Sequence, residues 1–267
     1  MAFRRAIDFR LKTRLLTIFL ELILPVGAVA AWWALSAGST SVYFPPLSQI
    51  VTALRETWLF EHWSTDVFPS LENLALGFLV SCLVGIGLGV LLGLLPIVAD
   101  AVAPVLEFLR AVPGVALLPA AILLLGIGAE TRISLIVFGT MWPILLNTID
   151  GVRAIDPMVR DVAESYQIRG LGWLRRIVLP AASPQIVAGM RTALSVGITV
   201  MVFSELSGTT NGIGFQILSA QRSFAVPQMW AGMILLGIIG YLLNIAFRGF
   251  EHVVLRWHRG MRQLARS

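Results

Sequence analysis

The sequence predicts an all-α membrane protein with about six transmembrane helices, and three observations support this. Hydrophobic residues make up 57% of the 267 residues and charged residues 13%, against about 25% charged residues in a soluble domain. The apolar residues gather in long segments, and the mean hydropathy is +0.83. In the topology that these segments imply, seventeen of the 20 basic residues lie on one side. That side is predicted to be cytoplasmic, with both termini.

Six apolar segments form the expected spans. The first, 15–35, follows five basic residues and has two interpretations: a retained transmembrane helix, or a signal peptide with a cleavage site at Ala28-Val29-Ala30. The length of the apolar run favours the retained helix. The other spans are expected at 67–95, 101–127, 132–149, 185–206 and 229–250.

Glycines and prolines predict the shapes of two spans. Glycines along 67–95 predict close contacts between helices: Gly77, Gly85, Gly87, Gly89 and Gly93. Three prolines in 101–127 predict a bent or broken helix beside protein or a water-filled cavity: Pro104, Pro113 and Pro119. A tight turn is expected at 96–100, which would place Glu107 and Arg110 near the cytoplasmic end of this span.

Two external segments are expected to contain short helices. Residues 37–66 include an amphipathic helix at 47–60, in which Trp58 is suited to the membrane interface. Residues 207–228 form an outer loop with a short helical piece.

The long polar interruption at 151–184 lies between the fourth and fifth spans. Asp156-Pro157 predicts a helix start, since Asp is a good N-cap and Pro suits the first turn. Gly170 and Gly172 are expected to break the middle, and Pro180 to stop the second helix. Such a loop is interpreted as a docking surface for a soluble partner. The alternative is a solvated basic loop near anionic lipid.

This loop resembles the coupling motif of membrane subunits of bacterial ATP-driven importers, Glu-Ala-Ala-x3-Gly-x9-Ile-x-Leu-Pro. The matching positions are Asp161, Val162, Ala163, Gln167, Ile177, Leu179 and Pro180. The chain departs from the motif at Asp161 for Glu, Val162 for the first Ala and Gln167 for Gly, and Gly170 is a nearby residue that can supply the turn. The flanking sequences WPILLNTIDGVRAIDP and LPAASPQIVAGMRTAL are similar to the nitrate, sulfonate, taurine and bicarbonate branch.

The resemblance implies a type I ABC importer permease fold, similar to MetI, in a bacterial inner membrane. It implies a permease domain at 67–250, an N-terminal part at 1–66 and a basic tail at 251–267. The expected partners are two ATPase subunits that carry ATP and Mg, a second permease copy, an external solute-binding protein and the lipid bilayer. The residues expected to couple to the ATPase are Asp161, Ala163, Gln167, Gly170, Ile177, Leu179 and Pro180.

A second polar set lies in the fifth span and the outer loop, where it is a candidate pathway or outer gate. Its members are Ser195, Thr199, Ser204, Glu205, Asn211, Gln216, Gln221 and Arg222, and the strongest candidates are Ser195, Thr199, Ser204, Glu205 and Arg222. Arg222 is suited to attract an anion, and Glu205 to grip a delivery protein outside. The alternative is ordinary hydrogen bonding of serine and threonine to their own helix.

Catalysis, metal binding and nucleic-acid binding are not expected. The sequence has no Gly-x4-Gly-Lys-Ser/Thr pattern, and Lys12 is its only lysine, so ATP hydrolysis is expected on a separate chain. The three histidines have no metal-ligand spacing, and Cys82 is the only cysteine. The alternative functions are a stand-alone secondary transporter or channel, or a membrane-embedded hydrolase. The sequence shows neither an inverted repeat nor a nucleophile–base set that would support them.

Overall fold

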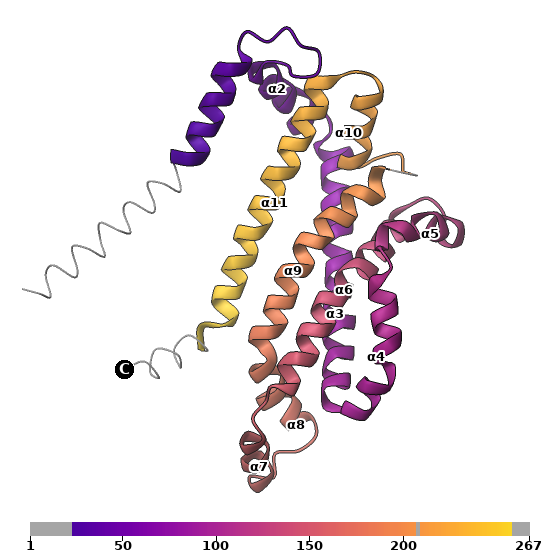
Figure 1. The fold of residues 1–267 in the computed structure, drawn as a ribbon, viewed down its shortest axis with the longest axis vertical. Helices are drawn as coiled ribbons and strands as arrows, with labels where there is room; N and C mark the ends of the chain where they lie inside the picture. Colours follow the sequence, from indigo (N-terminus) through magenta and orange to yellow (C-terminus); the bar gives the residue numbers. More distant parts are fainter. Residues whose placement is uncertain (1–22, 207–208, 258–267) are drawn as a thin grey trace, which may run out of the picture.

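The computed structural model describes residues 23–206 and 209–257, and every regular element in these residues is a helix. Figure 1 shows an elongated bundle whose two ends we call the α7 end and the α10 end, after the helices found there. Four helices run along the bundle and, with short extensions, are long and apolar enough to cross a bilayer. They are α3 (Phe68–Leu94), α6 (Ala129–Arg153), α9 (Leu179–Leu206) and α11 (Val226–Val254).

The contact between α3 and α6 depends on glycine. A Cβ atom at Gly89 would lie 2.5 Å from Thr148 Cβ, and one at Gly93 would lie 2.6 Å from Val152 Cβ. Gly77 and Gly85 meet α6 in the same way at Ile136 and Ile144, whereas Gly87 has no atom within 4 Å of such a Cβ. In all four contacts the α6 residue follows its glycine partner by the same number of positions: 77 and 136, 85 and 144, 89 and 148, and 93 and 152. The close contact predicted for this span is therefore confirmed, and α3 and α6 run parallel.

Because α3 and α6 are parallel, the chain between them must return from one end of the bundle towards the other. It does so through α4 (Pro96–Ala111), η3 (Gly114–Leu117) and α5 (Leu118–Leu125), which together form a span bent by 80°. The break is at Val112 and Pro113, which are extended with ψ of 118° and 120°. The residue before a proline avoids helical geometry. The predicted bent helix is thus confirmed; Pro104 lies inside α4, and Pro119 lies in the first turn of α5.

The prediction of a turn at 96–100 is wrong. Only Leu95 separates α3 from α4, because Pro96 begins α4 directly. Proline is favoured at the first helical position, where its missing N–H costs nothing. The depth predicted for Arg110 is also wrong, because Arg110 lies in the last turn of α4, beside the bend rather than near the α7 end.

Short helices gather at the α10 end. They are α2 (Leu47–Ala53), two π-helical segments, η1 (Leu54–Glu61) and η2 (Trp63–Val67), and α10 (Ile213–Arg222). Trp58 is 1% exposed, and its indole N–H donates to the Gln228 carbonyl over 3.1 Å. Trp58 packs against α11, where Gly232 leaves room for its ring, and its place at the membrane interface stays a prediction.

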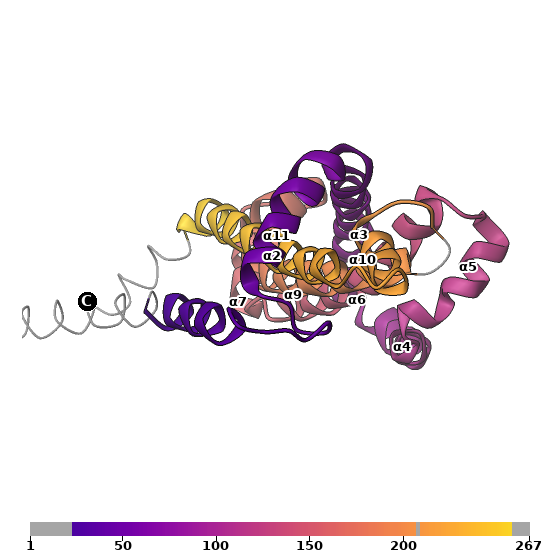
Figure 2. The ribbon, with the colours of Figure 1, turned by 90° about the horizontal axis from the view of Figure 1, so that it is seen from above.

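Figure 2 shows α4 and α5 at one edge of the bundle and the helix Ile23–Ser36 at the opposite side. The four long helices and the bent pair correspond in length and composition to five of the six expected spans. Of the first, 15–35, residues 15–22 lie outside the described residues, and most of the described part is exposed.

Candidate functional site

The loop between α6 and α9 forms the α7 end of the bundle (Figure 1). It contains α7 (Pro157–Ser165), α8 (Leu171–Trp173) and the π-helical η4 (Leu174–Val178). The predicted N-cap is confirmed, because the Met158 backbone N–H donates to Asp156 Oδ1 over 2.8 Å. Met158 would otherwise have no partner for its N–H within the helix.

Gln167 ends α7 in a left-handed conformation, with φ of 57°. The Gln167 N–H donates to the Glu164 carbonyl, and the Ile168 N–H to the Ala163 carbonyl, both over 2.9 Å. This pair of bonds is the Schellman arrangement, in which the left-handed residue is usually glycine. It gives a physical reason for glycine at this position of the coupling motif, and Gln167 adopts the same turn at a steric cost. Gly170 makes a separate turn, with φ of 55°.

The two faces of α7 differ. Three apolar side chains four residues apart lie on one face, and Met158, Val162 and Tyr166 are 71%, 51% and 76% exposed. Ala163 is buried and lines a groove of about 270 Å³ between α7 and the α8 segment, together with Ile168 and Trp173. The Asp161 side chain is exposed.

The loop returns to the bundle without a break. One helical segment runs from Leu171 to Leu206, so the prediction that Pro180 stops the helix is wrong, as is the expected start of the fifth span at residue 185. The preceding turn is π-helical, since the Leu179 N–H donates to the Leu174 carbonyl. Pro180 directly follows this wider turn, as the second residue of α9.

The return segment is fixed to the bundle by apolar packing. Val178 is fully buried in a cluster with Val90 on α3, Val152 on α6 and Ala182 on α9. Ile177 and Leu179 are half-buried. A displacement of the loop therefore acts on three long helices at once.

The polar set predicted in the fifth span is not brought together. Ser195 and Thr199 lie on the exposed side of α9, and the Thr199 hydroxyl donates to the Ser195 carbonyl over 3.2 Å. Ser204 is buried and donates to the Met201 carbonyl over 2.7 Å. Arg222 is exposed in the last turn of α10.

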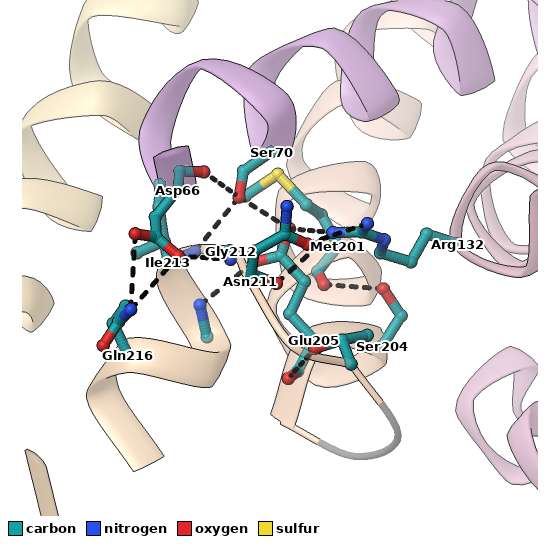
Figure 3. Close-up of polar contacts among 12 residues, drawn as sticks. Asp66, Ser70, Arg132, Met201, Ser204, Glu205, Asn211, Gly212, Ile213 and Gln216 are labelled. Carbon is teal, nitrogen blue, oxygen red and sulfur yellow. Dashed lines mark hydrogen bonds and ion pairs between the residues drawn. The ribbon is translucent and has the colours of Figure 1, made fainter. Parts of the chain in front are cut away.

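Glu205 is 0% exposed and lies in a polar network at the α10 end (Figure 3). The Ser70 hydroxyl donates to Glu205 Oε1 over 2.6 Å, and the Gly214 N–H to Oε2 over 3.0 Å. Arg132 Nη1 lies 3.8 Å from Oε1 and also donates to the Asn211 carbonyl over 3.4 Å. The Glu205 carboxylate thus holds the start of α10 against α3 and α6.

Asp66 extends this network towards α10. Its Oδ1 accepts the Gly212 N–H over 2.8 Å, and its Oδ2 lies 2.8 Å from His62 Nδ1 (Figure 3 shows Asp66 and Gly212). Sequence reasoning missed Asp66, Ser70 and Arg132. The available signal was a charged residue at the start of two predicted spans, where burial requires a partner.

The comparisons with known proteins identify the family. The family described as binding-protein-dependent transport system inner membrane component matches residues 85–259, about two thirds of the chain. The chain belongs to this family. Importer permeases of the family are transport subunits rather than enzymes, so the chain is a multi-pass permease of an ATP-binding-cassette importer.

Several curated permeases are similar to the chain over most of its length. The Bacillus subtilis protein named putative aliphatic sulfonates transport permease SsuC is 29% identical, over 88% of this chain and 86% of its own length. The Escherichia coli taurine transport system permease TauC is 28% identical, over 89% and 90%. The Synechocystis nitrate import permease NrtB is 31% identical, over 88% and 90%. The predicted resemblance to this branch is thus confirmed.

The fold is also similar to a solved structure. A chain of the MetNI methionine ABC transporter in an inward-facing conformation superposes with a TM-score of 0.61 at 20% identity. The match covers 71% of this chain and 94% of that one. The predicted MetI-like permease fold is therefore confirmed.

Proposed function

We propose that this importer permease forms the membrane pathway for a small sulfonated or nitrate-like anion, and that residues 156–180 couple it to a separate ATPase. Its relatives are named for aliphatic sulfonates, taurine and nitrate. In this proposal the α7 end lies in the cytoplasm of a bacterial cell, and the α10 end faces a solute-binding protein outside. ATP and Mg bind the ATPase, not this chain.

The exposed apolar side chains of α7 carry the proposal. Met158, Val162 and Tyr166 are more than half exposed on one face, whereas a solvated loop would place polar residues there. Covering one such side chain contributes about 1.5–3 kcal/mol. A partner that buries this face therefore gains several kilocalories per mole, before the cost of association.

The attachment of the loop supports coupling rather than tethering. A partner that moves α7 also moves α9, since the helical segment from Leu171 to Leu206 is continuous and Val178 is wedged among α3, α6 and α9. ATP drives transport only if the ATPase binds two arrangements of these helices with different affinity. Asp161 and Ala163 contribute a polar contact and a close approach.

The remaining parts of the assembly follow from a two-fold arrangement. A second permease copy completes the pathway, and each copy docks one ATPase subunit. Ser195 and Thr199, exposed on α9, are candidates for lining the pathway. Arg222, exposed on α10, attracts the anion as it arrives, while Ser204 and Glu205 act as an outer gate by holding the α9–α10 corner.

The test uses the permease coexpressed with its ATPase and compares two valine-to-glutamate variants. Val162→Glu places a charge on the α7 face, whereas Val253→Glu changes a valine on α11, outside the loop, that is also exposed (67% against 51%). Losing one apolar contact and burying a charge costs at least about 1.5 kcal/mol, or roughly tenfold in ATPase affinity. Val162→Glu should lose copurification and uptake, and Val253→Glu should keep both. Equal behaviour of the two variants, or uptake by the permease without any ATPase, overturns the proposal.

A further inference from the structure

A groove of about 180 Å³ lies between α4 and α6. Six of its lining residues are charged or carry a polar indole: Asp100, Glu107, Arg110, Trp142, Asp150 and Arg153. Arg153 Nη2 lies 3.3 Å from Asp100 Oδ1, so this ion pair neutralises two charges at the α7 end of the groove. The groove has room for several water molecules, since one needs only about 15 Å³. It is large enough for a small organic solute.

The far end of the groove lies at the edge of the bundle that α4 forms (Figure 2), where the Glu107 and Arg110 side chains are exposed, and far from the α7 end. At 1.5 Å per residue, Arg110 is about 21 Å along α4 from Pro96, within a hydrocarbon layer of about 30 Å. Within residues 23–206 and 209–257, neither Glu107 nor Arg110 has an ion-pair partner within 4 Å. Ionisable residues at membrane depth mark functional sites by default. Arg110 also lies directly before the break in α4, and broken helices are tolerated where they border a water-filled cavity.

Trp142 gives an independent indication of a ligand. Its side chain lines the groove from α6 and is 8% exposed, and its ring packs edge-on against Phe138 with centroids 5.5 Å apart. Its indole Nε1 is buried and has no hydrogen-bond partner among the described residues. A buried N–H without a partner is unfavourable, because it has given up its hydrogen bond to water. A rotation of the ring that turns this N–H towards an acceptor oxygen bound in the groove would restore a hydrogen bond.

The charges of the groove specify what it can hold. With Asp100 and Arg153 paired, the groove wall keeps one guanidinium, Arg110, and two carboxylates: Glu107, three residues before Arg110 on α4, and Asp150, about one turn before Arg153 on α6. A simple monoanion would gain from Arg110 but would be repelled by the carboxylates. A zwitterion satisfies both kinds of group, because a guanidinium fork matches an oxyanion and a carboxylate matches an ammonium.

We propose that this groove is a transit site for a small zwitterion: Arg110 and the Trp142 N–H bind its sulfonate or carboxylate group, and Glu107 binds its ammonium group. This inference rests on the proposed import function and narrows its solute class. The site lies apart from the polar set of α9, and the bent span α4–α5 supplies its charged wall.

The first test is protection of an engineered cysteine in the assembled transporter in nanodiscs. Cys82, the only cysteine, is replaced by serine, and Ala103→Cys is introduced on the groove wall. Ala101→Cys is the matched control, since Ala101 is exposed on the same helix and does not line the groove. Taurine should slow maleimide labelling at position 103 by about tenfold, which corresponds to about 1.4 kcal/mol. Labelling at position 101 should not change.

Comparison probes test the charge requirement. Ethanesulfonate lacks the ammonium group, and nitrate is a simple oxyanion, so both should protect position 103 less than taurine. Glu107→Gln should remove the preference for taurine over ethanesulfonate, and Arg110→Gln should remove protection by either. Retained copurification with the ATPase shows that these variants fold and assemble.

Three results overturn the inference: no protection by any probe, equal protection by all three probes, or an unreactive Ala103→Cys. Protection that appears only when phosphatidylethanolamine replaces phosphatidylglycerol in the nanodisc assigns the groove to a lipid headgroup and also overturns it. Failure of the proposed function looks different, because uptake by the unmodified complex would then be absent. Uptake by the complex without protection of position 103 would contradict only the site in the groove and would still support the permease function.

Discussion

Adding one methyl group at Gly89 should destabilise the bundle, while the same change two residues earlier should not. In Gly89→Ala the new Cβ would lie 2.5 Å from Thr148 Cβ, 2.8 Å from Thr148 Cγ2 and 2.9 Å from the Leu145 carbonyl oxygen. Carbon atoms prefer about 3.5–4.0 Å, so α3 and α6 must separate by about 1 Å at this level. Gly87→Ala is the matched control, since its Cβ meets no atom within 4 Å.

The magnitude follows from two opposing terms. Replacing glycine by alanine inside a helix stabilises it by about 0.8–1 kcal/mol. Forcing an extra carbon into a packed contact costs about 1–3 kcal/mol, and the carbonyl oxygen cannot rotate away. Gly87→Ala should therefore be neutral or slightly stabilising. Gly89→Ala should fall below Gly87→Ala by about 1–3 kcal/mol, because both variants gain the helical term and only Gly89→Ala bears the steric cost.

The assay is reversible unfolding of the purified permease in mixed micelles of dodecyl sulfate and a mild detergent, followed by circular dichroism. The free energies of unfolding of the two variants are compared directly. Equal values for Gly89→Ala and Gly87→Ala would refute the close parallel contact of α3 and α6. A loss at Gly87→Ala alone would mean that the two helices pack in a different register.

Three further outcomes are expected. Gln167→Gly should stabilise the end of α7 by about 1 kcal/mol, because glycine adopts positive φ without the cost borne by glutamine; slower amide exchange at residue 168 measures this, and unchanged exchange would contradict the assigned turn. Glu205→Ala should cost about 3–5 kcal/mol, since Arg132 would remain buried without its counter-charge; detergent unfolding tests this, and a loss under 1 kcal/mol would show that the network does not hold the corner. Trp58→Phe should cost about 1–2 kcal/mol by removing the bond to the Gln228 carbonyl, and thermal unfolding in detergent that matches the unmodified protein would contradict that bond.

The polar network around Glu205 and the loop at the α7 end lie at opposite ends of one long helical segment. At the α10 end, Glu205 near the end of α9 accepts a hydrogen bond from the Ser70 hydroxyl. At the α7 end, Val178, directly before α9, packs in the apolar cluster beside the loop. One continuous helical segment from Leu171 to Leu206 joins the two. A shift imposed at the loop therefore reaches the corner through one helical segment, in which Pro180 directly follows the π-helical turn and Pro184 lies inside α9.

Local signals made much of the fold predictable. Apolar runs long enough for a bilayer gave the order of the spans, and Pro113 gave the bend, since a proline acts on the residues beside it. Asp156 predicted the start of α7, since its side chain accepts a hydrogen bond from a backbone N–H two residues later. The spacing from Asp161 to Pro180 indicated the family, because all positions of the coupling motif lie within one short stretch of the chain.

Other features were decided by tertiary contacts. Pro96 was expected in a turn, yet it starts α4, and this places Arg110 beside the bend and opposite Trp142. Glu205 was expected to face outward, yet Ser70, 135 residues earlier, turns its carboxylate inward.

The sequence by itself determined that this chain spans a membrane, in which order its helices follow, and where a polar loop interrupts them. These properties depend on hydrophobicity and on neighbouring residues. Only the tertiary structure decided which glycines touch another helix, which charges meet, and where a groove opens. Such contacts join residues far apart in the chain, and the free energy of each depends on a partner whose position one sequence does not specify.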